Sequence, residues 1–189
     1  MKKFAAMILA LTMALSMAAC GNKAPAETVP AQEMPASALE VLETIWADYA
    51  EDEKFAVIGG SMAAPVDNAP GSYDIADENI TYSLLIPAEQ MDNVAEAASM
   101  IHMMNANTFT CGVVQLAEGA DAKAFAGVMR EAVQNNRWMC GFPEKLIIAV
   151  IGGEYVLTAF GVNDTMNPFE GNLASTYADA EIVYNEAIG

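Results

Sequence analysis

Two apolar runs separated by a glycine pair impose the strongest constraint on the fold of this chain. Leu146 to Ile151 and Tyr155 to Phe160 are rich in β-branched and aromatic residues, and Gly152-Gly153 lies between them. Glycine takes the positive φ angles of a tight hairpin turn without steric cost. The pattern therefore predicts a β-hairpin.

A second hairpin is predicted upstream. An apolar run from Ser99 to Met104 is followed by a polar corner, Asn105-Ala106-Asn107, and then by the β-branched and apolar stretch Thr108 to Leu116. Runs of this composition joined by a short polar turn are typical of antiparallel strands.

Helices are predicted after each hairpin. Asp121 precedes a helical pattern of Ala122, Phe125, Met129, Ala132 and Val133, and acts as its N-cap, with Gly141 and Pro143 ending the segment. Near the C-terminus we expect a turn region from Asn163 to Asn172, and then an amphipathic helix. Its apolar positions are Leu173, Tyr177, Ala180, Tyr184 and Ala187.

The folded domain is predicted to begin with a helix at Ser37. The stretch Ser37-Ala38-Leu39-Glu40 is a capping-box pattern, and Leu39, Leu42, Trp46 and Tyr49 follow at helical spacing. The 153 residues from Ser37 to Gly189 are enough for one domain, and we see no boundary for a second.

The segment between these elements is the least determined. Phe55 to Ile58 suits a short strand, and the residues up to Ser72 are rich in Gly, Ala, Pro and Asn, which favours a long loop. Ile80 to Ile86 suits either a strand or a short helix ending before Pro87, and helix is slightly favoured. The expected class is α+β: an antiparallel sheet of two hairpins in the order ββαββα, with an additional N-terminal helix and the helices packed on the sheet.

The N-terminus predicts where the protein is located. Lys2 and Lys3 precede a sixteen-residue run without charge, Phe4 to Ala19, and Cys20 follows directly. A run of this length falls short of the roughly twenty residues that span a bilayer, which favours a cleaved signal over an uncleaved membrane helix. Pro-rich residues 20–36 then predict an extended tether of about 3 Å per residue.

The stretch Leu15-Ser16-Met17-Ala18-Ala19-Cys20 resembles the lipobox of bacterial lipoproteins, with Met17 where that family more often has leucine. The resemblance implies removal of the signal peptide 1–19 and attachment of a diacylglycerol to Cys20. It also implies a membrane partner through the lipid anchor, and a location at the extracytoplasmic face of the cell membrane.

Charge excludes some partners. Once Lys2 and Lys3 are removed, the chain has 25 acidic and 6 basic residues, which gives a formal charge of −19. Such a chain repels nucleic acid and anionic lipid, so no nucleic-acid partner is expected. It suits cations or cationic peptides, although an acidic surface also serves solubility alone.

A second resemblance concerns the domain itself. Residues 138–157, with the glycine pair inside them, look like the carboxy-terminal half of a family of small clostridial lipoproteins, and Met100 to Gln134 are similar too. The likeness covers roughly Asp77 to Phe160. The family's function is unassigned, so it implies an architecture and no catalytic residue.

The inventory of reactive side chains is small. His102 is the only histidine, and we find no nucleophile elbow, no paired-histidine helix and no glycine-rich phosphate loop. We therefore predict no enzyme, no catalytic residue and no cofactor.

Soft ligands and thiols form the alternative class. Strand alternation places Met100 and His102 on one face with Met104, a set that suits Cu(I), although methionine also fills irregular cores. Cys111 and Cys140 are left after Cys20 is acylated, and either a disulfide or two free thiols is compatible with the sequence. No Cys-x-x-Cys motif supports a thioredoxin-like exchange role.

The leading functional hypothesis is a non-catalytic, lipid-anchored domain that binds a protein, peptide or small ligand near the membrane. A narrower version makes it an accessory of a transport or bacteriocin system. The alternative is a copper-binding or thiol-redox lipoprotein.

Overall fold

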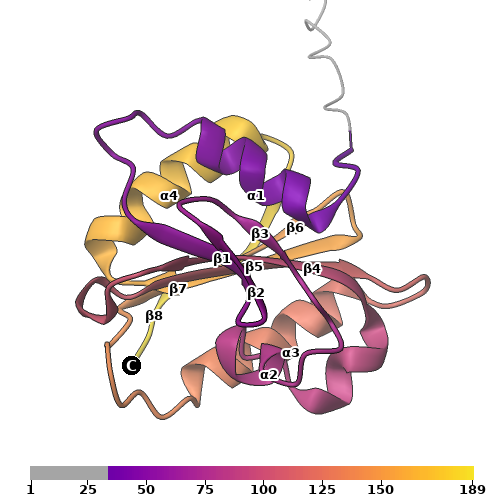
Figure 1. The fold of residues 1–189 in the computed structure, drawn as a ribbon. Coiled ribbons are helices and arrows are strands. Elements are labelled where there is room, and N and C mark those ends of the chain that lie inside the picture. The colour runs from indigo at the N-terminus through magenta and orange to yellow at the C-terminus, as the bar shows by residue number, and fades with distance from the viewer. Residues whose placement is uncertain (1–33) are drawn as a thin grey trace, which may run out of the picture. The chain divides into compact units, whose positions relative to one another are not determined.

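Eight strands form one antiparallel sheet in the computed structural model, which describes residues 34–189 (Figure 1). The predicted signal peptide, Cys20 and most of the tether lie outside the described residues. The strands are β1 (Val57–Ser61), β2 (Ala64–Asp67), β3 (Gly71–Tyr73), β4 (Val94–His102), β5 (Phe109–Leu116), β6 (Lys145–Ile151), β7 (Tyr155–Gly161) and β8 (Glu181–Ala187). Their spatial order is β2-β1-β4-β5-β7-β6-β8, with β3 also paired to β4. The predicted α+β class is confirmed.

The helices lie on both faces of the sheet, so the domain has three layers (Figure 1). They are α1 (Ala38–Ala47), α2 (Ile80–Ser83), α3 (Ala122–Gln134) and α4 (Asn163–Thr176), with two short 3₁₀ helices, η1 (Ala88–Asn93) and η2 (Asn105–Asn107). No helix within 34–189 has both the length and the apolar character needed to cross a membrane.

Both predicted hairpins are confirmed. β4 and β5 pair antiparallel across the Asn105–Asn107 turn, and β6 and β7 pair antiparallel across the glycine pair. Gly152 and Gly153 have φ angles of 59° and 82°, which only glycine adopts freely.

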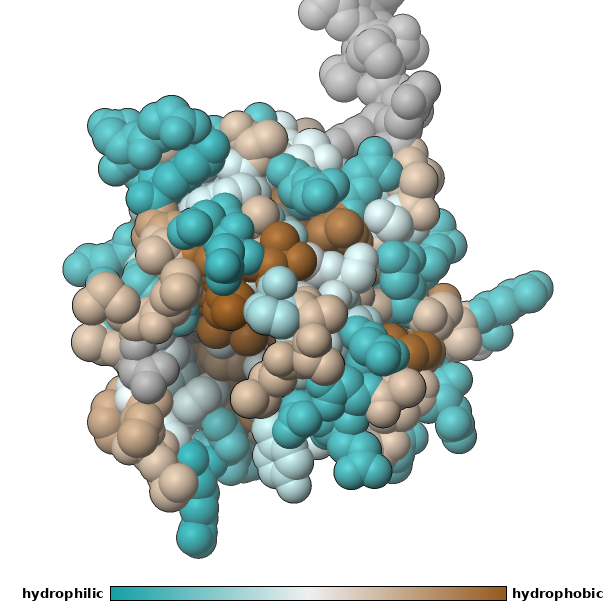
Figure 2. Space-filling model, viewed as in Figure 1, coloured by the Kyte–Doolittle hydropathy of each residue, from teal (hydrophilic) through white to brown (hydrophobic). Residues whose placement is uncertain are grey.

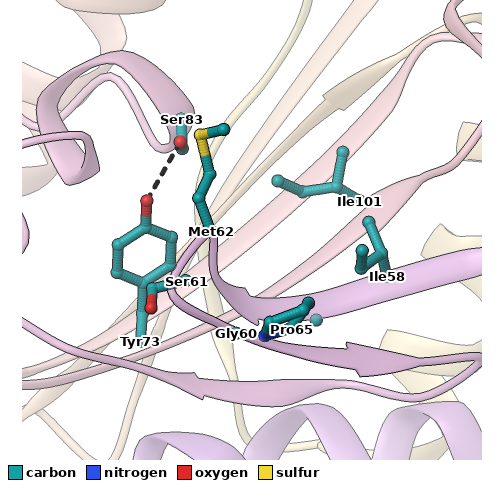
Figure 3. Close-up of a pocket in the computed structure, with 9 residues that line it drawn as sticks. Ile58, Gly60, Ser61, Met62, Pro65, Tyr73, Ser83 and Ile101 are labelled. Carbon is teal, nitrogen blue, oxygen red and sulfur yellow. Dashed lines mark hydrogen bonds between the residues drawn. The ribbon is translucent and has the colours of Figure 1, made fainter.

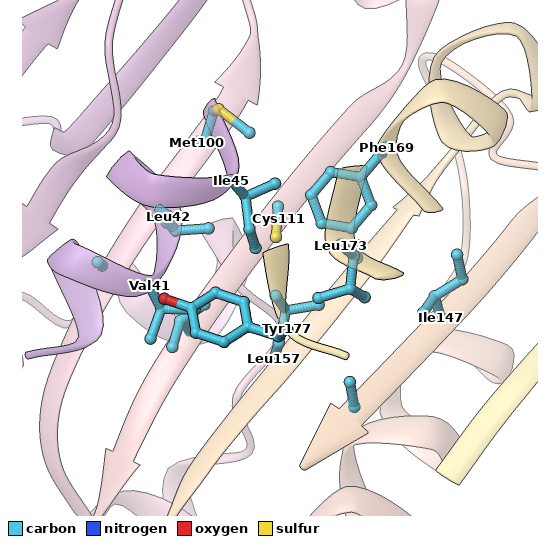
Figure 4. Packing of buried hydrophobic residues seen from close by; sticks show 14 of the residues in the cluster. Val41, Leu42, Ile45, Met100, Cys111, Ile147, Leu157, Phe169, Leu173 and Tyr177 are labelled. Carbon is cyan, nitrogen blue, oxygen red and sulfur yellow. The ribbon is translucent and has the colours of Figure 1, made fainter. Parts of the chain in front are cut away.

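One face of the sheet is covered by α1 and α4 (Figure 4). Val41, Leu42 and Ile45 of α1 and Phe169 and Leu173 of α4 are fully buried against it. The predicted face of α1 is partly right. Leu42 is fully buried as expected, but Leu39 and Trp46 are only partly buried, and Val41 and Ile45 take their places against the sheet.

The opposite face is covered mainly by α3, with the shorter α2 beside it. Asp121 caps α3 as predicted, because its carboxylate accepts hydrogen bonds from the backbone N–H of Lys123 and Ala124. The helix ends at Gln134, before the predicted stop. Gly112 of β5 leaves room for Leu84, whose side chain would lie 3.2 Å from a Cβ at that position.

The chain enters the domain beside the β6–β7 turn. The buried hydroxyl of Tyr155 donates a 2.9 Å hydrogen bond to the carbonyl oxygen of Pro35, and the Ala36 N–H donates to the Glu40 carboxylate at 2.6 Å. Ser37 accepts from the Glu40 N–H, as the capping pattern predicts. Residues 34–36 are thus part of the fold, three residues earlier than expected.

The long loop predicted before Ser72 is wrong. This segment forms β1, β2 and β3, and both β1 and β3 pair with successive parts of β4. The glycines act here as close-approach residues, since a Cβ on Gly59 would lie 2.1 Å from the backbone nitrogen of Gly71. The helical preference for the segment before Pro87 is confirmed by α2.

The predicted C-terminal helix is also wrong. Residues 163–172, which were expected to form turns, belong to helix α4. The residues expected to form the last helix instead form the end of α4 and the edge strand β8. Met166, Phe169 and Leu173 give α4 its buried face, and Pro168 lies inside the helix. Tyr184 at the helical spacing belongs instead to β8, opposite Ile148.

Candidate functional site

One row of side chains crosses the sheet at the end where the β4–β5 turn lies, on the α2 and α3 face. Cross-strand pairing links Ile58 to Ile101, Ile101 to Thr110, and Thr110 to Phe160. Directly paired residues point to the same face of a sheet. Neither Ile58 nor Ile101 is fully buried, so this row is incompletely covered by helices.

A hollow of about 260 Å³ opens over the β1 end of the row (Figure 3). Ile58 and Ile101 form one side, and Met62 and Tyr73 lie across from them. The Tyr73 hydroxyl donates a 3.0 Å hydrogen bond to Ser83 of α2, which fixes that wall. No charged side chain lines this hollow.

A smaller hollow of about 150 Å³ adjoins the first one, since Ile101 lines both. Its other walls include Met104, Thr110, Cys140 and Trp138. The Trp138 ring packs on Phe160 with centroids 5.3 Å apart. Its indole Nε1–H is buried and has no hydrogen-bond acceptor among the described residues. A buried donor without a partner costs about 1–3 kcal/mol.

His102 lies at the edge of the same hollow, and its ring is on the α1 and α4 side of the sheet, where His102 pairs across strands with Val57. Its ring stacks on Phe55, with centroids 4.9 Å apart and planes 7° from parallel. The Met104 N–H donates a 2.9 Å hydrogen bond to Nδ1, so the neutral ring carries its proton on Nε2. Burial lowers the pKa of His102, which favours this neutral form.

Two of the methionines that line the hollows are exposed: Met62 is 78% exposed and Met104 57%. Met139 and Phe142, which are also exposed, flank the lining residue Cys140 in the chain. Figure 2 shows hydrophobic side chains at the surface in the middle of this view, where the surface is hollowed, with hydrophilic side chains around them. Flexible methionines adapt to ligands of different shape, which is typical of peptide-binding surfaces.

Acidic side chains are in excess over basic ones in the whole chain. The ion pairs within 34–189 use Lys54, Lys123, Arg130 and Lys145, while most acidic side chains remain without a basic partner. Asp67 lies opposite Ile58 on the edge strand β2 and so extends the row by one strand. The two hollows together, hereafter the groove, are thus lined by uncharged side chains, and Asp67 lies one strand beyond Ile58.

The predicted soft-ligand set is only partly brought together. Met100 is fully buried in the cluster under α1 and α4, whereas His102 and Met104 line the smaller hollow. A metal on His102 Nε2 would require the proton to move and the Nδ1 hydrogen bond to break. Within residues 34–189, no group of three or more His, Cys, Asp or Glu side chains could hold a metal ion.

The two cysteines are both free, so of the two states left open by the sequence the structure shows the unbridged one. Cys111 is buried beside Ile45, Phe169 and Leu173, where burial raises the pKa of its thiol (Figure 4). Cys140 is exposed in the segment after α3. Their separation into a core position and a surface position explains why no bridge forms.

Trp138 and Ile101 are the site residues that reasoning from the sequence missed. In the sequence, Trp138 belonged only to the stretch that resembles a lipoprotein family. Ile101 lay on the other face of the strand from Met100 and His102, the face that was not considered for a site. The sequence did show a cluster of large apolar residues near the predicted turns: Met103, Met104, Met139 and Phe142. The structure shows that all four are exposed.

No family model, no curated protein and no solved structure matches this chain.

Proposed function

We propose that this protein is a lipid-anchored, non-catalytic binding domain at the extracytoplasmic face of the cell membrane, and that the groove is its binding site. The observation that carries the binding proposal is the pair of adjoining apolar hollows over Ile58, Ile101 and Thr110, bordered by exposed methionines. Concave apolar sites with a few placed polar groups are the usual form of ligand sites. The lipobox-like stretch ending at Cys20 supports the anchor.

The geometry of the chain's entrance supports this arrangement. Pro35 is held by Tyr155 at the first residue of β7, while the groove lies over Phe160, near the other end of that strand. Five residues of strand span about 17 Å. The groove therefore lies at the end of the sheet away from Pro35, where the tether joins the domain.

The lipid anchor is tested by mass spectrometry of the full chain purified from membranes. We expect a mature N-terminus at Cys20 carrying a diacylglycerol, and loss of both in a Cys20→Ala variant. An intact Met1, or an unmodified Cys20 at the mature end, would refute the anchor.

The binding site is tested by photo-cross-linking in native membranes. A benzoylphenylalanine at Met62, which lines the larger hollow, is compared with one at Glu43, an exposed residue of α1 on the opposite face. We expect an adduct of defined mass from position 62 only. Equal labelling from both positions, or none from either, would contradict the assignment of the groove.

A further inference from the structure

We infer that the larger hollow of the groove binds a small, uncharged and mainly apolar ligand that carries one hydrogen-bond acceptor, such as a carbonyl or hydroxyl oxygen. The acceptor is bound by the hydroxyl group of Ser61. This inference rests on the proposed function and names the ligand class of the same site. Three features of the hollow support it: a hydroxyl group without a partner, an uncharged lining and a limited extent.

Ser61 supplies a hydrogen-bonding group that the fold leaves unused. It ends β1, lines the larger hollow and is 2% exposed. Its hydroxyl group makes no hydrogen bond within residues 34–189 and, unlike the indole N–H of Trp138, is not sealed from the surface. The other two hydroxyl groups in the wall, those of Tyr73 and Ser83, are hydrogen-bonded to each other. A hydroxyl group with so little access to water gains from a ligand oxygen in the hollow, because the ligand supplies the missing acceptor.

The uncharged lining selects against ions. Ile58, Ile101 and Pro65 give the hollow an apolar wall, and the described residues that line it include no carboxylate, ammonium or guanidinium group. An ionised ligand would therefore lose its hydration without gaining a partner of opposite charge. A neutral ligand avoids this cost. Its apolar part is favoured because it covers Ile58 and Ile101, which the helices leave only partly buried.

The extent of the hollow limits the ligand to a small molecule. An apolar cavity of about 150 Å³ holds one benzene molecule. The hollow has a volume of about 260 Å³, which by the same measure suits a ligand of about ten non-hydrogen atoms. Thr110 and Phe160, the next residues of the row, are buried. The open surface therefore does not continue across the sheet, as the track of an extended peptide would.

The test uses four probes that have the same number of non-hydrogen atoms and nearly the same shape. Acetophenone has a carbonyl oxygen, α-methylstyrene has a methylene group in its place, benzoate is an anion and benzamidinium is a cation. Each probe is titrated into the full chain in lipid nanodiscs, and isotope-labelled methyl groups of Met and Ile are observed by NMR. Titration into empty nanodiscs gives the free concentration of each probe.

We expect acetophenone to shift the methyl signals of Met62 and Ile101, which line the hollow, and not that of Met103, an exposed residue outside it. Benzoate and benzamidinium should bind at least about tenfold more weakly, because nothing in the hollow replaces their hydration. Ser61→Ala should weaken acetophenone binding about fivefold, the loss expected for one hydrogen bond, and should not weaken α-methylstyrene binding. The matched control is Ser72→Ala, which removes an exposed hydroxyl group of β3 and should change neither.

Several results would overturn the inference. These are binding of a charged probe as tight as that of acetophenone, methyl shifts that are not confined to the hollow, no binding of any probe, or an equal effect of Ser61→Ala on the two neutral probes. The ratio of these two effects decides even if Ser61→Ala loosens the fold, because loosening weakens both probes alike. An adduct from position 62 with the mass of a peptide or protein would also overturn the inference and leave the proposed function standing. The proposed function fails separately, when position 62 gives no specific adduct at all.

Discussion

A single methyl group added at Gly59 should disrupt the β1 side of the groove. Gly59 lies where β1 passes the start of β3, and a Cβ there would be 2.1 Å from the nitrogen of Gly71, 2.4 Å from the carbonyl carbon of Pro70 and 2.6 Å from the oxygen of Ala69. All three are backbone atoms. They cannot move aside as a flexible side chain can.

The magnitude follows from the required displacement. Non-bonded heavy atoms reach their energy minimum at about 3.5 Å, so β1 and β3 would have to separate by more than 1 Å in Gly59→Ala. Overpacking by a methylene group costs about 1–3 kcal/mol where side chains adjust. Because only backbone atoms could move here, we expect Gly59→Ala to lower the free energy of unfolding by about 3 kcal/mol. If detaching β3 from β4 costs less than this, the variant releases β3 instead.

Urea denaturation of Gly59→Ala and hydrogen exchange of the β3 amides measure the two outcomes. Gly171→Ala is the matched control. Gly171 lies in α4, no atom is within 4 Å of its Cβ position, and alanine in a helix is more stable than glycine by about 1 kcal/mol. The reasoning is refuted if Gly59→Ala unfolds within about 0.5 kcal/mol of the wild type while β3 exchange is unchanged.

Three further outcomes are expected. Tyr155→Phe should lower the free energy of unfolding by about 1 kcal/mol in urea denaturation, because it removes the hydrogen bond to the backbone at the domain entrance. Burial lowers the folded pKa of His102 below its unfolded value, so the unfolded state takes up the proton first as pH falls. The stability that the neutral ring contributes is therefore lost as the pH falls below about 6.5. Between pH 7.5 and 5, the urea midpoint of His102→Asn should depend less on pH than that of the wild type. Thiol labelling of the native protein should modify Cys140 rapidly and Cys111 only after denaturation, and equal rates would contradict the burial of Cys111.

The central strands and α3 could be predicted because local preference and tertiary position agree there. Leu146 to Ile151 is buried on both faces, so its continuous apolar run identifies a strand wherever its neighbours lie. Gly152 and Gly153 have the positive φ angles that a tight turn requires. Asp121 has its capping role within four residues of chain, so no distant contact was needed to identify it.

The C-terminal region could not be predicted because two periods fit the same residues. Leu173 and Tyr177 belong to α4 and its end, and Tyr184 continues their helical spacing although it lies in β8. What decides for the strand is the free edge of β6, with which residues 181–187 pair. That edge exists only after the sheet has formed, so the information is tertiary.

The same reasoning explains why the groove was the hardest part to predict. Its β1 side is built from glycines, a proline and small residues, a composition that favours a loop. Each of these residues has a role set by its position. Gly59 and Gly71 allow β1 and β3 to approach closely, and Pro65 lies on the edge strand β2, where proline is tolerated. Small residues there also leave the hollow unfilled, which larger strand formers would not. A segment selected to pack would carry the apolar side chains that identify strands. This segment lacks them where the groove opens, and such a departure from local preference agrees with the binding site proposed above.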